Sequence, residues 1–373
     1  MKIESSRTLI DGMFQPAALT IENGRIVDVS HQVSATATSD YLVPGFIDVH
    51  YHGCYLANSV ENPLESLKMM SKKALLEGTT SFYPTTTSIA LVEIKTALKE
   101  MVKYYNNQPR GHTQMLGIHL EGPFMQEEYS GSQLTQYFLD CTSELFEDIK
   151  NAAEGLIRYV TLAPEKITES NIIKQIVSND IVVSLGHTGC TFDQAMEAIN
   201  KGATSATHLY NAMGKLSHHS PGVITACLLD DRVYAQIIVD GHHVSYPSIQ
   251  LALKCKGFDK VILVTDSNSA KGMEAGEYNL NGREVVMGSD GTVRTKKNNS
   301  LAGSTACMNR CIENIVNHCG VTVAEACKMA SENVARLMNL KTKGKIQTGF
   351  DADLVFMNEK FDIKRVIVHG EEC

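Results

Sequence analysis

The sequence predicts an α/β protein: a (β/α)8 barrel of the TIM type, with a small β domain built from both chain ends. Two observations support this class. Through the middle of the chain, eight short apolar or β-branched runs alternate with helix-like segments, which is typical of βα units in a parallel sheet. The two ends instead carry short strand-like runs separated by turn signals. An open doubly wound sheet is the alternative arrangement of the βα units.

The chain ends contain strand signals without helical periodicity. Near the N-terminus, ALTIENGRIVDVS places Asn23 and Gly24 between two apolar runs, a pattern typical of a hairpin turn. Near the C-terminus, KGKIQTGFDADLVFMNEKFDIKRVIVHGEE shows the same alternation of short apolar runs and turns. We therefore expect residues 1–43 and 340–373 to pair into the small domain, leaving residues 44–339 for the barrel.

The eight central runs are each followed by a helix-like segment. Two of these segments, NPLESLKMMSKKALLEG and TFDQAMEAINKG, end in glycine, a common helix C-terminal signal. Eight βα units suit a barrel whose active site lies at the C-terminal ends of its strands. The predicted strands are residues 45–50, 79–86, 115–121, 158–164, 181–187, 204–209, 234–240 and 261–266.

Metal-ligand side chains occur at the ends of these runs. His50 and His52 close the first run at a spacing of two, so in a strand their side chains point to the same face. Strand ends form one ring in a barrel, so residues far apart in the sequence converge there. The other members of the set are Glu121 after the third run, His187 after the fifth, His208 within the sixth and Asp266 closing the eighth.

A hydrolytic metal centre is the common explanation for four imidazoles and two carboxylates at equivalent strand ends, although each residue alone has an ordinary structural explanation. A divalent ion in such a ring acidifies bound water. Asp266, facing that water, is then the natural proton carrier. Nitrogen and oxygen ligands without thiolate suit one or two ions of Zn²⁺, Fe²⁺, Mn²⁺ or Co²⁺. The expected ligands are Glu121, His187 and His208 for one ion, and His50 with His52 for a second.

Composition and charge limit the partners. The chain has 373 residues, 34 Lys and Arg against 42 Asp and Glu, and a formal net charge of −8, with no long basic run. This balance argues against nucleic acid or an anionic membrane and favours a small molecule. No signal-peptide pattern or long apolar run is present, so we expect a cytoplasmic protein. Ten cysteines without a CxxC pair predict reduced thiols.

Further histidines lie near the predicted pocket. His242 and His243 follow Asp240 at the end of the seventh run, so we expect one of them to contact substrate from the pocket rim. His219 lies in the loop LSHHSPG after the sixth run. His119, two residues before Glu121, is interpreted as structural.

The motifs PGFIDVHYHG, GIHLEGPF, SLGHTGCTFDQA, ATHLYNAM, VDGHHV, VTDSNSAKG and SLAGST, in this order along the whole chain, resemble the N-acetylglucosamine-6-phosphate deacetylases of the amidohydrolase superfamily. The resemblance implies a (β/α)8 barrel with a small β-sandwich, and a homodimer with active sites near the interface. It also implies metal-dependent hydrolysis of N-acetylglucosamine-6-phosphate, an amino-sugar phosphate, to glucosamine-6-phosphate and acetate.

The resemblance carries roles onto individual residues. It implies metal ligation by Glu121, His187 and His208, with Asp266 as the general acid/base and a further metal ligand. His50 and His52 match a motif that some members use for a second metal. Stretches that line the sugar-phosphate site correspond to Asn211, Ala212, Asp240, Gly241, His242, His243, Leu301, Ala302 and Gly303.

Two positions depart from the family pattern. YSGSQL places Ser132 and Gln133 where the family commonly has a loop histidine that polarises the acetyl carbonyl; a glutamine amide donates a hydrogen bond but is a weaker, neutral electrophile. HSPG places His219 where the family has an arginine that grips the 6-phosphate. These departures motivate an alternative: deacetylation of another N-acyl amino sugar, either N-acetylgalactosamine-6-phosphate or an unphosphorylated sugar.

Two other functions rank lower. A hydantoinase or dihydroorotase type usually needs a carbamylated lysine from the end of the fourth strand, where this chain has TLAPEK, and Glu121 already offers a bridging carboxylate. A non-catalytic scaffold should have eroded ligands, and all six are present.

Overall fold

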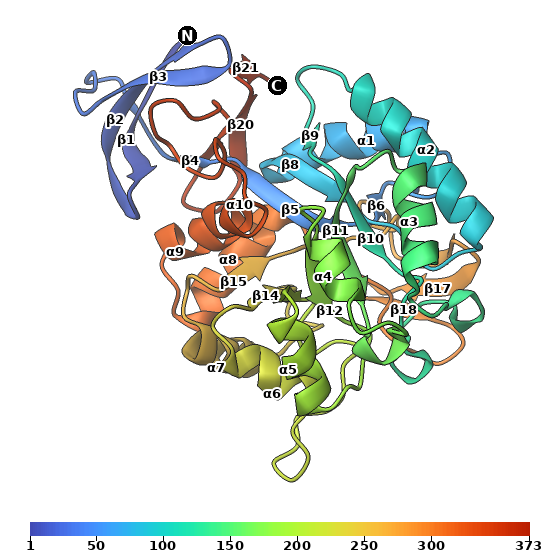
Figure 1. Cartoon of the computed structure of the whole chain (residues 1–373). Helices are drawn as coiled ribbons and strands as arrows, with labels where there is room; N and C mark the ends of the chain where they lie inside the picture. Colours follow the sequence, from blue (N-terminus) through green and yellow to red (C-terminus); the bar gives the residue numbers. More distant parts are fainter.

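Strands from both chain ends pair into one sheet in the computed structural model, which describes residues 1–373. β1 (Lys2–Ile10) lies between β2 (Met13–Glu22) and β4 (Thr38–Pro44), and β4 pairs with β19 (Leu354–Met357) from the other end of the chain. The two termini consequently lie close together at the top of Figure 1. The full order is β21–β20–β19–β4–β1–β2–β3, with β3 at Arg25–Ser30, β20 at Ile363–Val368 and β21 at Glu371–Glu372.

This terminal sheet curls so that its β3 edge meets the segment before β19. Ile26 N donates to Phe350 O at 2.9 Å, and Gly349 N donates to Ile26 O at 2.8 Å. The curl encloses a separate core that includes Leu19, Ile26 and Phe356. Both chain ends therefore form a second domain beside the larger body in Figure 1.

The predicted barrel is confirmed. Six parallel strands, β10 to β15, pair in chain order, and β5, β8 and β9 form a second parallel sheet. Parallel bridges from Thr85 to His119 and from Tyr51 to Ser267 join the two sheets at both seams, which excludes an open doubly wound sheet. The bounds are β5 Phe46–Tyr51, β8 Thr79–Pro84, β9 Gln114–Met115, β10 Ile118–Glu121, β11 Ile157–Leu162, β12 Val182–Leu185, β13 Ala203–Ala206, β14 Tyr234–Ile237 and β15 Val261–Leu263.

Helices cover the outside of this ring (Figure 1). The helix predicted within TFDQAMEAINKG is α5, which begins with a capping box between Thr191 and Gln194. None of the helices combines the length and apolar character that a membrane span needs. The helices are α1 Pro63–Ala74, α2 Leu91–Asn106, α3 Ser143–Ala152, α4 Ile172–Val177, α5 Phe192–Asn200, α6 Val223–Leu229, α7 Tyr246–Lys256, α8 Met308–Cys319, α9 Val323–Ala330 and α10 Glu332–Leu337.

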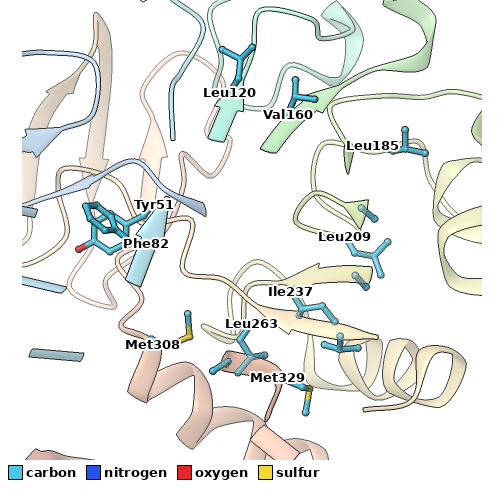
Figure 2. Packing of buried hydrophobic residues seen from close by; sticks show 14 of the residues in the cluster. Tyr51, Phe82, Leu120, Val160, Leu185, Leu209, Ile237, Leu263, Met308 and Met329 are labelled. Atoms are coloured by element: carbon cyan, nitrogen blue, oxygen red, sulfur yellow. The ribbon is translucent and has the colours of Figure 1, made fainter. Parts of the chain in front are cut away.

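The main hydrophobic core lies between the barrel strands and these helices. Along β10, buried Leu120 belongs to this core, whereas its neighbours His119 and Glu121 do not, as expected for alternating strand faces. Burying a side chain of this size contributes about 1.5–3 kcal/mol. Figure 2 shows equivalent residues arranged along an arc, among them Val160, Leu185, Ile237 and Leu263, with Met308 and Met329 beside them.

A three-stranded antiparallel sheet lies between β15 and α8, and the sequence pattern of eight central strands omits it. It consists of β16 (Gly276–Leu280), β17 (Arg283–Met287) and β18 (Val293–Thr295). Asn281 and Gly282, with φ of 53° and 80°, form the two-residue turn between the first two strands. A short hairpin, β6 (Gly53–Cys54) with β7 (Ala57–Asn58), follows the first barrel strand.

Candidate metal centre and active site

The structure brings all six predicted metal-ligand residues together at the C-terminal ends of the barrel strands. Five of them are buried and His52 is partly exposed, and all except His50 line the cavity. They form two groups, and within each group the ligand atoms all lie within 4.8 Å of one another. One group is His50, His52 and Asp266; the other is Glu121, His187 and His208.

The ligand atoms are spaced as ligands of a common ion would be. The Nε2 atoms of His187 and His208 are 3.2 Å apart, and both lie within 3.5 Å of Glu121 Oε1. The Nε2 atoms of His50 and His52 are 3.1 Å apart. Two ligands held tetrahedrally about 2.0–2.1 Å from a zinc ion lie about 3.4 Å apart. The measured separations therefore match the edges of a metal coordination shell.

The outward-facing nitrogens of two of these histidines are fixed by hydrogen bonds. His50 Nδ1 donates to Gln236 Oε1 at 3.0 Å, and His187 Nδ1 donates to the Tyr129 carbonyl at 2.9 Å. With Nδ1 protonated, each Nε2 keeps its lone pair and can bind an ion. Gly189 makes the second contact possible, because a Cβ at that position would lie 2.0 Å from the Tyr129 ring.

One carboxylate oxygen of the ligand ring is buried without a hydrogen-bond partner. Glu121 Oε1 is fully enclosed and faces imidazole nitrogens rather than a donor in good geometry. An unsatisfied carboxylate oxygen costs free energy unless a cation compensates it. The orphaned oxygen and the lone-pair-bearing nitrogens together fit a divalent ion with nitrogen and oxygen ligands.

The electrostatics of the pocket also favour a bound cation. Burial opposes ionisation of Asp266, but the neighbouring histidines, His50 first, lower the pKa of its carboxyl to about 2. Burial likewise opposes ionisation of Glu121, and His50, His187 and His208 hold its pKa well below the usual range. Burial opposes charging of His50, yet Asp266 and Glu121 raise its pKa to about 10. The carboxylates therefore stay ionised and attract positive charge. A divalent metal would supply that charge in place of the imidazole protons.

Three of the six residues have a left-handed backbone. His187, His208 and Asp266 have φ of 50°, 33° and 48°. Such conformations cost about 1–3 kcal/mol each for residues with a side chain and cluster at functional sites. The strand ends bend there so that the side chains turn into the ring.

A buried polar network supports the ring from inside the barrel. His119 Nε2 lies 2.7 Å from Thr161 Oγ1, which lies 2.8 Å from Thr207 Oγ1. Gln236 Nε2 donates to Tyr159 OH at 2.6 Å while its Oε1 holds His50. Because each member has a partner, the network fixes side-chain positions below the site. His119 lies in this network and not in the cavity.

The metal-ligand ring opens into a cavity of about 390 Å³. Gln133 lines it in one orientation, because Thr87 Oγ1 and Ser88 N donate to its Oε1 at 2.5 and 2.9 Å. Its amide nitrogen donates to Glu121 Oε2 at 3.0 Å. The other predicted substrate residues that line this cavity are Ser132, Asn211, Ala212, His243, Leu301, Ala302 and Gly303.

Four predicted substrate residues do not line the cavity. His219 is exposed on the loop after β13. Asp240 lies behind His243, whose Nδ1 donates to its Oδ2 at 2.6 Å. Although burial opposes it, this hydrogen bond lowers the pKa of Asp240. Gly241 and His242 follow Asp240 in the same turn and stay outside.

The cavity also has lining residues that we did not predict. Arg283 and Arg294 enter from β17 and β18 of the three-stranded sheet. The sequence signal of Arg283 is the stretch EYNLNGREVVM, in which Asn281-Gly282 separates two alternating runs. Gln236, which holds His50 from below and does not line the cavity, is also a residue that we did not predict; its signal is a polar residue inside the apolar run YAQIIVD.

Comparison with known proteins identifies the family to which the chain belongs. The model of the amidohydrolase family matches residues 41–373, which includes the whole ligand ring. The chain belongs to the amidohydrolase family. Amidohydrolases are typically dependent on divalent metals, in agreement with the His/Asp/Glu cluster described above.

Two curated relatives resemble this amidohydrolase over nearly their full length. N-acetylglucosamine-6-phosphate deacetylase of Lysinibacillus sphaericus is 32% identical, with 94% of this chain and 91% of the relative covered. N-acetylgalactosamine-6-phosphate deacetylase of Escherichia coli O157:H7 is 31% identical, with 97% and 96% covered.

A solved structure extends the likeness to three dimensions. A mutant N-acetyl-D-glucosamine-6-phosphate deacetylase of Mycobacterium smegmatis, in complex with N-acetyl-D-glucosamine-6-phosphate, superposes with a TM-score of 0.93 at 28% identity. The superposition covers 100% of this amidohydrolase and 98% of that chain. The barrel and the second domain are thus shared as a whole.

Proposed function

We propose that the protein is a metal-dependent deacetylase that hydrolyses N-acetylglucosamine-6-phosphate to glucosamine-6-phosphate and acetate. The observation that carries this proposal is the ring of six strand-end ligands, whose facing atoms are spaced as a metal coordination shell requires. The resemblance to deacetylases over almost the full chain supports the substrate.

Glu121, His187 and His208 are the proposed ligands of one ion, and His50, His52 and Asp266 of a second. Zn²⁺, Fe²⁺, Mn²⁺ and Co²⁺ all accept this donor set. A divalent ion bound there polarises an amide carbonyl and acidifies water.

The chain's own residues account for the movement of protons. Asp266 borders the cavity and stays ionised, so it can take a proton from the attacking water as the C–O bond forms. The same carboxyl returns that proton to the amine nitrogen as the C–N bond breaks, releasing acetate and the amino sugar. Gln133, anchored through its carbonyl, points its amide into the ring and is our candidate hydrogen-bond donor to the acetyl oxygen.

N-acetylgalactosamine-6-phosphate is a second candidate substrate. The Escherichia coli relative that carries this activity in its name covers the chain as completely as the N-acetylglucosamine-6-phosphate deacetylases do. The two sugars differ only in the configuration of one ring hydroxyl, so residues that bind the sugar ring decide between them. Ser132, Asn211 and Leu301 to Gly303 are the proposed ring contacts.

A hydantoinase-type site is disfavoured by the lysine at the end of the fourth strand. Lys166 pairs with Glu127 at 3.0 Å and Asp140 at 3.1 Å and does not belong to either ligand group. Three further features stay predictions: the assignment of residues 1–43 and 340–373 to a β-sandwich, a homodimer, and a cytoplasmic location.

Acetate release by the metal-stripped and reloaded protein tests the proposal. The protein is stripped with a chelator, reloaded with Zn²⁺, Mn²⁺ or Fe²⁺, and assayed on N-acetylglucosamine-6-phosphate, N-acetylgalactosamine-6-phosphate and N-acetylglucosamine. We expect no release without metal and the highest kcat/KM for the first sugar. A preference for the second sugar would select the alternative, and no release with any metal and sugar would refute a deacetylase.

A further inference from the structure

Glu165 lies beside a metal-ligand histidine but belongs neither to a ligand group nor to the cavity lining. It follows β11, in a one-turn 3-10 helix, Pro164–Lys166. β11 pairs in parallel with β12, and His187 follows β12. Because neighbouring parallel strands of a barrel end at the same face, the fold brings Glu165 next to His187.

Both carboxylate oxygens of Glu165 hold the turn formed by residues 187–189. Oε1 accepts a hydrogen bond from Gly189 N at 2.8 Å, and Oε2 accepts one from Thr188 Oγ1. The adjacent Lys166 pairs with other carboxylates and not with Glu165. Since Thr188 is fully buried, its hydroxyl would be left without an acceptor if Glu165 were removed, which is costlier than exchanging one for water.

The turn needs this support because His187 has a left-handed backbone, with φ of 50°. Such a conformation costs free energy and persists only where the surroundings hold it. Neighbouring loops contribute backbone contacts: Gln126 N donates to His187 O at 3.0 Å, and Thr188 N donates to Ala212 O at 3.1 Å. Apart from the ligand ring, Glu165 is the only side chain of another segment that is hydrogen-bonded to the turn. Replacing Glu165 therefore loosens His187 without removing a metal ligand or a cavity residue.

We propose that Glu165 is a positioning residue of the metal centre, which keeps His187 Nε2 where it can share an ion with Glu121 and His208. The carboxylate fixes the backbone of the turn, and the Tyr129 carbonyl fixes the imidazole ring through Nδ1. Partners that orient a ligand in this way raise the affinity of a site for its metal. The inference rests on the metal centre of the proposed function and not on the identity of the sugar.

Zinc affinity, measured by competition with a coloured chelator, tests this role without using turnover. Glu165→Ala should weaken, by about tenfold, the zinc-binding step that His187→Gln abolishes. Glu165→Gln should recover most of that loss, because its amide oxygen still accepts from Gly189 N and its amide nitrogen can donate to Thr188 Oγ1. With excess Zn²⁺, KM for N-acetylglucosamine-6-phosphate should stay within about twofold in both Glu165 variants, since Glu165 does not line the cavity.

Glu169→Ala is the matched control. Glu169 accepts hydrogen bonds from Ser143 N at 2.8 Å and from Ser143 Oγ at 2.5 Å, the same pair of donor types, but at the start of α3. This variant should leave zinc affinity unchanged. An equal loss in Glu165→Ala and Glu169→Ala, or a zinc affinity of Glu165→Ala within twofold of wild type, would overturn the proposal. Zinc binding by Glu165→Gln that is as weak as in Glu165→Ala would assign the effect to charge rather than to hydrogen bonds and would also overturn it.

Thr188→Val keeps the proposal testable if Glu165→Ala does not fold. It removes the hydroxyl that donates to Glu165 and retains the size of the side chain. The same zinc-binding step should weaken by about three- to tenfold, and unchanged affinity would overturn the proposal. Wild type that binds zinc with the expected dependence on Glu165 but releases no acetate would refute the deacetylase and leave the role of Glu165 intact.

Discussion

The two walls of the active-site cavity are built on different principles. On one wall, the metal ligands sit at the ends of barrel strands, where ring closure brings residues 50 to 266 together. On the other wall, Gln133 comes from a loop and Arg283 from an inserted hairpin. The positions of the residues on the strand-end wall follow from the fold class. The positions of the residues on the loop wall depend on loop and hairpin sequences that are particular to this chain. We expect metal binding and proton transfer to depend on the first wall, and hydrogen bonding to the substrate to depend on the second.

Asp266→Asn should have the largest effect, because it removes the proposed proton carrier from the strand-end wall. We expect kcat for acetate release to fall by about 10²- to 10⁴-fold. Metal content is measured in parallel to separate proton transfer from ligand loss. Asp193→Asn, at an exposed position in the first turn of α5, is the control. A decrease smaller than tenfold would show that Asp266 is not the acid/base.

Gln236→Leu should weaken the strand-end wall without touching substrate. The variant loses the acceptor that holds His50 Nδ1, so the ring can rotate and change tautomer. We expect metal affinity to fall by about 10- to 100-fold, measured by competition with a coloured chelator. Gln250→Leu on the surface of α7 should change nothing. Unchanged affinity in Gln236→Leu would mean that His50 is oriented by other contacts.

Much of the strand-end wall could be predicted from the sequence, and little of the loop wall. Ligands such as Glu121 and Asp266 end apolar runs whose periodicity marks them as strands, so the fold class alone brings them together. The sequence pattern does not predict that the Tyr129 carbonyl accepts a hydrogen bond from His187, because every residue type has a backbone carbonyl. Arg283 was missed because the eight-strand pattern left no place for a further hairpin, although Asn281-Gly282 signalled one.

Asp240→Asn should have a moderate effect, on the stability of the turn that carries His243 to the cavity. Asp240 accepts hydrogen bonds from His243 Nδ1 and two backbone amides, so the variant should lower the free energy of unfolding by about 1–2 kcal/mol at pH 7. The lowered pKa of Asp240 in the folded state means that this stabilisation is complete above its unfolded value near 3.8 and is lost as pH falls further. Urea unfolding of the wild type and of Asp240→Asn from pH 7 to pH 3 measures the difference between their free energies of unfolding. A difference that stays constant down to pH 3 would contradict this role of Asp240.

Arg294→Gln should have the smallest effect. Arg294 Nη1 already donates to the Asn299 carbonyl at 3.1 Å, and this contact is exposed to solvent. We expect KM for the phosphorylated sugar to rise about two- to fivefold, as for an exposed charge pair. A rise larger than tenfold would show that Arg294 contributes more to substrate binding than an exposed side chain should.

The most direct test of the central claim is calorimetric titration of metal-free protein with Zn²⁺, with acetate release measured at each point. Wild type should bind tightly and gain activity in step with the ions bound, whereas the double variant His187→Gln and His208→Gln should lose both tight binding and turnover. Full acetate release by the metal-free protein, or unchanged zinc affinity in the double variant, would contradict the assignment of the strand-end ring as the metal centre.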